Sequence, residues 1–75
     1  MYVKNSNAVI RDVNGTQKRF VDCELYADTA PSPLPTAADI PGFTSDDQIE
    51  AGSTLTIVNT ATVYVADENG EFVQW

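Results

Sequence analysis

The alternation of apolar and polar residues predicts β-strands at both ends of the chain. In residues 20–26, Val21, Cys23 and Leu25 share one parity and are predicted to face the core. A second apolar run at residues 8–10 precedes a turn signal at residues 12–15. These features predict a β-hairpin over residues 7–22 that extends to residue 26.

The turn of this hairpin, Asp-Val-Asn-Gly at residues 12–15, permits two registers. A two-residue loop of Asn14 and Gly15 would place Arg11 directly opposite Lys18, and like charges in that position destabilise a strand pair. We therefore expect a three-residue loop in which Gly15 adopts the left-handed conformation.

The last third of the chain, residues 53–75, predicts an antiparallel meander. Residues 53–59, 62–66 and 72–75 are rich in β-branched and aromatic side chains, and short turn signals separate them. The second turn repeats the Asp-x-Asn-Gly pattern of the first hairpin, with Gly70 expected to be left-handed. The predicted cross-strand pairs are Val63 with Trp75, Val65 with Val73, and Ala66 with Phe72.

Residues 28–52 have no strand pattern. Three prolines between residues 31 and 35 remove backbone donors and predict an extended connector, and Pro41-Gly42 predicts a turn. Ser45 and Gln48 are spaced as a capping box, which predicts one short helical turn. A connector of about 25 residues in a small domain is typical of a binding loop or of an arm that orders on assembly.

Together these elements predict one all-β domain over residues 1–75. Its expected architecture is a small antiparallel β-sandwich or partly open barrel with a long Pro-containing loop. A domain of this size buries only about 60% of the surface that its unfolded chain exposes, so its core is modest and its stability is expected to depend on partners.

The composition argues against most catalytic chemistry. The chain has no histidine and one cysteine, which excludes a Ser-His or Cys-His pair, an internal disulfide and a thiolate zinc site. The acids Asp46, Asp47 and Glu50 could bind a hard cation, but neighbouring acids in a loop are typical of a solvated surface. We therefore expect no enzymatic activity, no metal and no cofactor. Cys23, between two acids, is expected to be an unreactive thiol.

The charges are unevenly distributed along the chain. The net charge is -7, which disfavours binding to nucleic acid or to an anionic membrane. All four basic residues lie in the first nineteen positions, and ten acids follow with no base. The basic segment is expected either to lie on the acidic body of its own chain or to meet the acidic face of another copy; both alternatives remain open here.

No targeting segment is predicted. The apolar runs are far shorter than the roughly 20 residues that a membrane helix needs, and polar residues interrupt the first thirteen positions where an export signal would need an apolar run. We therefore expect the protein to be made in the cytoplasm.

Residues 52–75 carry a recognisable pattern: Gly-Ser-x-Leu-x-Ile-Val-Asn-Thr at 52–60, Val-Tyr-Val at 63–65, an acidic Gly turn, and Phe-Val-x-Trp at 72–75. This pattern resembles the C-terminal meander of short structural proteins of tailed phages and prophages of Gram-positive bacteria. The resemblance implies a virion or assembly role, in the head, neck or tail of a particle built in the bacterial host cytoplasm. It implies no catalytic residue.

These observations predict a non-enzymatic phage structural or assembly protein that contacts itself, other phage structural proteins, or both, with a homo-oligomer expected. The alternative is an acidic inhibitor or DNA mimic that occupies a basic groove of a host protein. An aromatic at position 75 is expected to be either tied down by the sheet or offered to a neighbour. The candidate interaction residues are Lys4, Arg11, Lys18, Arg19, Asp46, Asp47, Glu50, Tyr64, Phe72 and Trp75.

Overall fold

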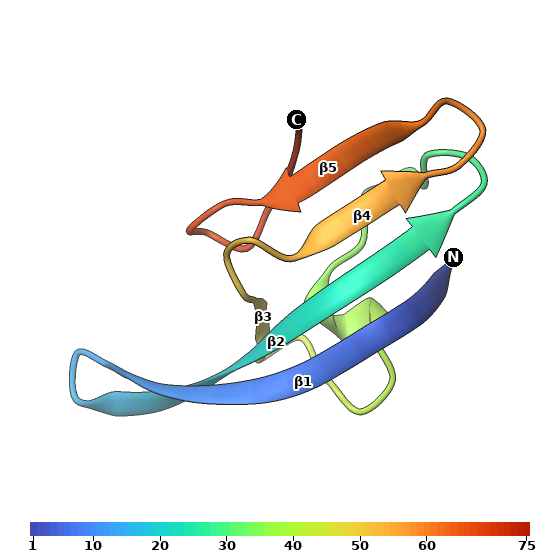
Figure 1. The fold of residues 1–75 in the computed structure, drawn as a ribbon. Helices are drawn as coiled ribbons and strands as arrows, with labels where there is room; N and C mark the ends of the chain where they lie inside the picture. The colour runs from blue at the N-terminus through green and yellow to red at the C-terminus, as the bar shows by residue number, and fades with distance from the viewer.

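The computed structural model describes residues 1–75 and confirms the all-β prediction with a long Pro-containing loop (Figure 1). In chain order the elements are β1 (Tyr2–Val13), β2 (Thr16–Ala27), η1 (Ala37–Asp39), β3 (Gln48–Ile49), β4 (Thr54–Ile57), β5 (Thr62–Ala66) and β6 (Phe72–Gln74). The only helical element is the single 3-10 turn η1, so no helix here is long and apolar enough to cross a bilayer.

The strands form one open, mixed sheet with the order β1-β2-β4-β5-β6, and β3 lies beside β2. The chain has no second sheet and the strands do not close into a barrel. β3 and β4 pair parallel with β2, whereas all other pairs are antiparallel. The parallel pairs were not predicted. Parallel pairing requires a long connection between the two strands, and the connector after β2 is long enough to bring β3 and β4 alongside β2 in the same direction.

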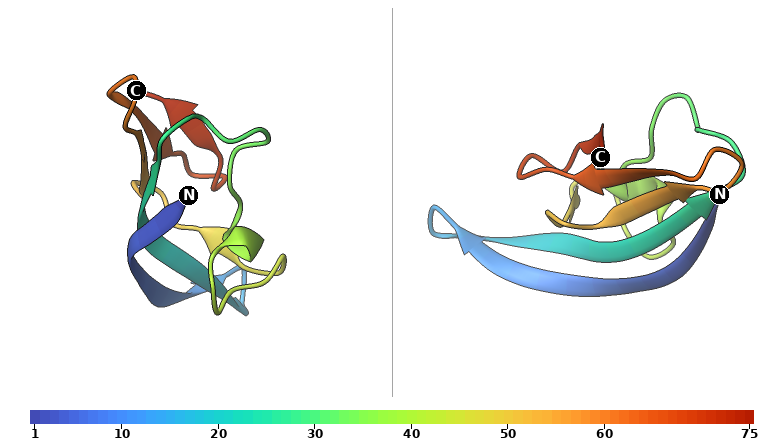
Figure 2. Two further views of the ribbon diagram at one scale, coloured as in Figure 1. Left: turned by 90° about the vertical axis from the view of Figure 1, so that its right-hand side faces the viewer. Right: turned by 45° about the horizontal axis from the view of Figure 1, so that its top comes forward.

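The connector covers one face of the sheet and takes the place of a second sheet (Figure 2). It therefore wraps its own domain. The core contains buried residues of the strands and of the connector, namely Val21, Cys23, Leu25, Ala27, Ala37, Ile40, Ile49, Leu55, Ile57, Ala66 and Phe72, with Leu34 and Phe43 packed against them. Val21, Cys23 and Leu25 are at most 2% exposed, which confirms their predicted core orientation.

The predicted helical turn after Ser45 is wrong, because the chain there enters strand β3. The Thr44 amide donates a hydrogen bond to the Asp47 carboxylate at 2.8 Å, which closes a turn instead. Ile49 then packs beside Val21 with 1% of its surface exposed. Burial of a large aliphatic side chain outweighs the small free energy of a local cap.

The predicted three-residue loop of the first hairpin is also wrong. Asn14 and Gly15 form a two-residue loop with φ of 52° and 81°, so Val13 pairs with Thr16. These angles match the mirror-image turn that suits the twist of a hairpin.

This register places Arg11 opposite Lys18, and each cation has a separate partner outside the hairpin. The Arg11 guanidinium lies 2.8 Å from the Glu50 carboxylate, and the Lys18 ammonium donates to the Gln48 side chain at 2.9 Å. These partners, supplied by β3 and the residue after it, offset the repulsion that argued against this register.

The predicted C-terminal meander is confirmed in β4, β5 and β6. Val65 pairs with Val73 and Ala66 with Phe72, as expected. The remaining predicted pair is present as a hydrogen bond from the Trp75 amide to the Val63 carbonyl at 2.8 Å. Gly70 has a φ of 79°, the left-handed value that its turn requires.

Candidate functional site

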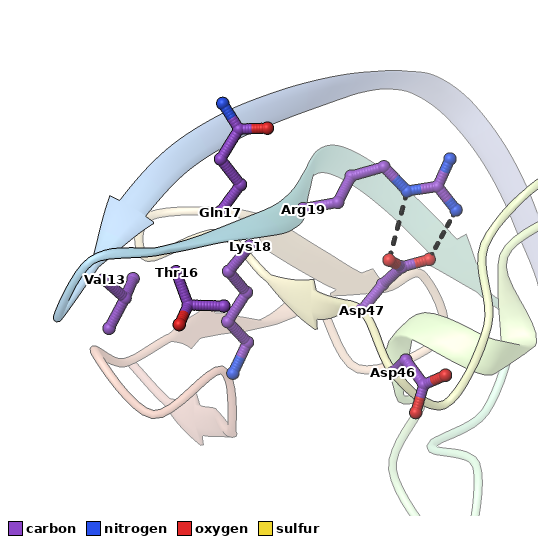
Figure 3. A pocket seen from close by; sticks show the side chains of 7 residues that line it. All are labelled: Val13, Thr16, Gln17, Lys18, Arg19, Asp46 and Asp47. Carbon is purple, nitrogen blue, oxygen red and sulfur yellow. Dashed lines mark hydrogen bonds and ion pairs between the residues drawn. The ribbon is translucent and has the colours of Figure 1, made fainter.

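The first group of candidate residues fixes the hairpin to the connector. The Arg19 guanidinium binds the Asp47 carboxylate through two hydrogen bonds, Nε to Oδ1 at 3.0 Å and Nη2 to Oδ2 at 2.6 Å (Figure 3). Its Nη2 also donates to the Gly42 carbonyl, and its Cζ lies over the Phe43 ring, 4.8 Å from the ring centre. The bidentate ion pair and the cation–π contact hold the connector in one position against β2.

The ion pair shifts the pKa values of both partners. The hydrogen bonds from Arg19, followed by the one from the Thr44 amide, hold the pKa of the Asp47 carboxyl below its ordinary value. Hydrogen bonding to Asp47 raises the pKa of Arg19 in turn. Asp47 is therefore ionised over a wider pH range in the folded chain than in the unfolded chain.

We expect the stability contributed by Asp47 to disappear in acid. Because its pKa is lower in the folded state, this contribution is complete at neutral pH and is lost as the pH falls below about 4. Asp47→Asn should therefore be less stable than the wild type at pH 7, and the difference should shrink at pH 3 in urea denaturation. The control is Asp46→Asn, an exposed neighbour outside the ion pair, which should leave the pH profile unchanged. A constant difference across pH would contradict this assignment.

A second group surrounds Phe20. The Arg11 guanidinium and the Lys18 ammonium lie 5.9 Å and 5.8 Å from its ring centre. Glu50 Oε2 is buried and has no hydrogen bond of good geometry. The Arg11 guanidinium, 2.8 Å away, therefore balances the negative charge of this carboxylate as an ion pair. Arg11 and Arg19 thus both use acids of their own chain, which favours the alternative in which the basic segment lies on its own acidic body.

The depression between these groups is open and polar. It has a volume of about 470 Å³ and is lined by Val13, Thr16, Gln17, Lys18, Arg19, Asp46 and Asp47 (Figure 3). Arg19 and Asp47 satisfy each other there, and Val13 is the one apolar residue of the lining. Lys18 donates to the Gln48 side chain, so Asp46 is the one charged residue of the lining whose side chain has no partner within the chain.

The remaining candidates lie apart from one another. Phe72 is buried in the core and Tyr64 is half-buried against it, so neither is an exposed contact residue. Lys4 is exposed and has no carboxylate partner, and its ammonium lies 5.7 Å from the ring centre of Tyr26. Trp75 is 91% exposed.

Cys23 is confined to the core. It is 2% exposed, and burial raises the pKa of its thiol, an effect that the nearby Asp22 carboxylate adds to. The hydrogen bond with Ser53 acts in the opposite direction. The thiol is therefore protonated at neutral pH and shielded from solvent.

The sequence did not reveal that β1 is an edge strand. Its twelve residues pair on one side only, with β2, and most of its side chains are exposed. Residues 4–8 contain only one apolar residue, a signal that could have indicated a strand outside the core.

The connector leaves the opposite face of the sheet uncovered (Figure 2). Val73 lies on that face, because its neighbour Phe72 faces the core and successive side chains of a strand alternate between the two faces. Comparison of this chain with protein-family models, with curated proteins and with solved structures gives no match. The β1 edge and the uncovered face are the two surfaces of the sheet that remain open to a partner.

Proposed function

We propose that this protein is a non-enzymatic structural or assembly protein of a phage or prophage particle, which acts through protein-protein contacts that include contacts between its own copies. The observation that carries the proposal is the β1 edge. An edge strand presents a row of unpaired N–H and C=O groups, and these groups are a template for pairing with another strand.

The two edges of the sheet differ in how far they are protected. β6 has three residues, and a very short edge strand offers little template. β1 has twelve residues and contains neither proline nor glycine. Only the start of β1 is protected against pairing with another strand, by a bulge between Val3 and Asn5. The stretch from Asn5 to Asp12 is left open.

The hairpin geometry defines which β1 groups point outward. A two-residue loop closes on a hydrogen-bonded pair, here Val13 with Thr16, and hydrogen-bonded pairs then alternate along the ladder. The backbone groups of Ser6, Ala8 and Ile10 therefore point away from β2.

The uncovered face supplies a second contact surface. Val73 is 53% exposed and Trp75 91% exposed, while the hydrogen bond from the Trp75 amide to β5 fixes its backbone. Exposed tryptophans are among the residues that contribute most to binding energy when a partner covers them.

The phage setting rests on the resemblance of residues 52–75 to short phage structural proteins. The alternative of an acidic mimic has less support, because Asp47 and Glu50 are used within the chain. The other acids are dispersed over β1, β2, the connector and the β5–β6 turn. A mimic needs acids on one rigid face.

We expect the wild type to show an apparent mass that rises with concentration in sedimentation velocity. Ala8→Pro should reduce this association at least tenfold, because proline removes an outward N–H, and edge strands tolerate proline at such positions. Ala8→Val keeps that N–H and is the matched control. Circular dichroism checks that both variants remain folded.

A chain that stays monomeric at all concentrations would contradict the self-contact in this proposal. The particle role is tested separately, by immunoblotting purified particles and assembly intermediates from the host. Detection at a fixed ratio to the major structural proteins is the expected result, and absence from both fractions would contradict it.

A further inference from the structure

We propose that Asn14 is a self-modification site, at which the side-chain amide is lost by spontaneous deamidation in the folded protein. The chain has two Asn-Gly pairs, at residues 14–15 and 69–70, and both lie in turns between strands. Asn-Gly offers this reaction little steric hindrance, because glycine has no side chain beside the attacking nitrogen. The structure leaves the first pair free to react and holds the second in place.

The reaction is an intramolecular substitution followed by hydrolysis. The backbone nitrogen of Gly15 attacks the side-chain carbonyl carbon of Asn14. A bond forms between this nitrogen and Cγ, the bond from Cγ to the side-chain nitrogen breaks, and ammonia leaves with the proton of the Gly15 amide. Water then opens the cyclic imide at either carbonyl carbon, which leaves aspartate or isoaspartate. Nothing is oxidised or reduced, so water is the only co-reactant.

The attacking nitrogen of Gly15 is unoccupied in the folded chain. The loop closes on the pair of Val13 with Thr16, and the Gly15 N–H donates no backbone hydrogen bond. A Cβ added to Gly15 would have nothing within 4 Å beyond its neighbours in the chain. Asn14 itself is exposed, so water reaches the reacting carbon.

The peptide between Asn14 and Gly15 also has room to turn. Attack requires this peptide to rotate about the Cα–C bond of Asn14, away from its conformation in the closed loop. The loop lies at the free end of the hairpin, which projects from the body of the domain (Figure 1). Only the last pair of the ladder, Val13 with Thr16, has to open for the rotation. Opening at the end of an element has a low free energy.

The pair Asn69-Gly70 is restrained by contrast. The Gly70 N–H donates to the Asp67 carbonyl at 3.0 Å, so the attacking nitrogen is occupied. The Asp67 carboxylate accepts hydrogen bonds from the amides of Asn69 at 2.9 Å and of Glu71 at 3.0 Å. Gly70 also packs against β3, where an added Cβ would lie 2.6 Å from Cγ of Gln48. Rotation of this peptide therefore requires the turn to leave β3.

Deamidation of Asn14 changes the end of the hairpin in two ways. It adds one negative charge, two residues from Asp12, to a chain whose net charge is already -7. Isoaspartate also lengthens the backbone by the side-chain methylene, and a mirror-image loop of two residues does not accommodate an extra backbone atom. The pair of Val13 with Thr16, which ends the β1 edge, is therefore expected to open as the protein ages.

The test is site-resolved mass spectrometry of the folded wild type during incubation in mildly alkaline buffer. Asn14 should deamidate at least about tenfold faster than Asn69, because only Asn69 has to break contacts with another element before it reacts. In guanidinium chloride the two rates should agree within about threefold, because unfolding removes that difference. Equal rates in the folded chain, a faster reaction at Asn69, or reaction at Asn14 only after unfolding would each overturn the proposal.

Asp67→Ala checks the protection of the second pair. It removes the carboxylate that holds the amides of Asn69 and Glu71, and should speed deamidation of Asn69 at least about threefold without changing the rate at Asn14. Asp67→Asn makes the same charge change but keeps a side-chain oxygen as acceptor, so it is the matched control and should retain the wild-type rate. Circular dichroism checks that both variants are folded. An Asn69 rate that rises alike in both variants, or in neither, would contradict the role given to the Asp67 carboxylate, and the wild-type comparison decides the assignment of Asn14.

Discussion

Leu25→Ala is expected to lower the free energy of unfolding by about 2–5 kcal/mol, which is a large part of the total for a domain of this size. Leu25 is fully buried on the central strand β2 and pairs with Leu55 on β4, under the connector. Its removal leaves a cavity between the sheet and the connector, and both are needed to close the core. With a total of about 4–11 kcal/mol at this length, the variant is expected to be partly unfolded at 37 °C.

The measurement is urea denaturation followed by circular dichroism. Val58→Ala is the matched control, since Val58 is 54% exposed and its truncation should cost less than about 0.5 kcal/mol. A loss below about 1 kcal/mol for Leu25→Ala would mean that the connector does not close over β2 as described.

Ser53→Ala is expected to cost about 1–3 kcal/mol, because it leaves a buried amide without an acceptor. β3 pairs with β2 as far as Val21, and β4 pairs with β2 from Glu24 onward. Neither strand pairs with the two residues of β2 between them, and Ser53 fills this gap. Its hydroxyl accepts a hydrogen bond from the Cys23 amide at 3.1 Å and donates its own O–H to the Val21 carbonyl at 3.4 Å.

The measurement combines denaturation with hydrogen exchange by NMR. In Ser53→Ala the Cys23 amide should lose protection selectively, while Ser45→Ala, a change at an exposed serine, should have no effect on either readout. Unchanged protection of the Cys23 amide would show that another acceptor replaces the hydroxyl.

The elements that the sequence predicted correctly depend on nearby residues. Strict alternation in residues 20–26 was sufficient to orient Val21, Cys23 and Leu25, and the glycine turn at residue 70 was sufficient to set the pairing of β5 with β6. Both are decided by side-chain parity and turn geometry, which act over a few residues.

The features that the sequence did not predict depend on residues far apart in the chain. The loop of the first hairpin was predicted from the repulsion between Arg11 and Lys18, but partners from residues 48–50 changed the balance. The parallel pairing of β2 with β4 depends on the path of the connector, and no local pattern specifies that path.

The candidate site was predictable only in part. The concentration of basic residues near the start of the sequence predicted that Arg11 and Arg19 contact acids. The sequence left open whether those acids belong to the same chain, as they do here. The edge position of β1 follows from strand order, which periodicity does not encode.

The position of β2 between β1 and β4 has a consequence for how the chain folds. The first hairpin can form from neighbouring residues, but β4 lies about thirty positions further along, as the Cys23 to Ser53 hydrogen bond illustrates. Closing so long a loop is entropically costly, so the remote pairing is the slow event. During synthesis the hairpin therefore emerges before β4, and its apolar side stays exposed to solvent until β4 pairs with β2. Apolar surface and an unpaired strand edge that are exposed in this way favour aggregation over folding.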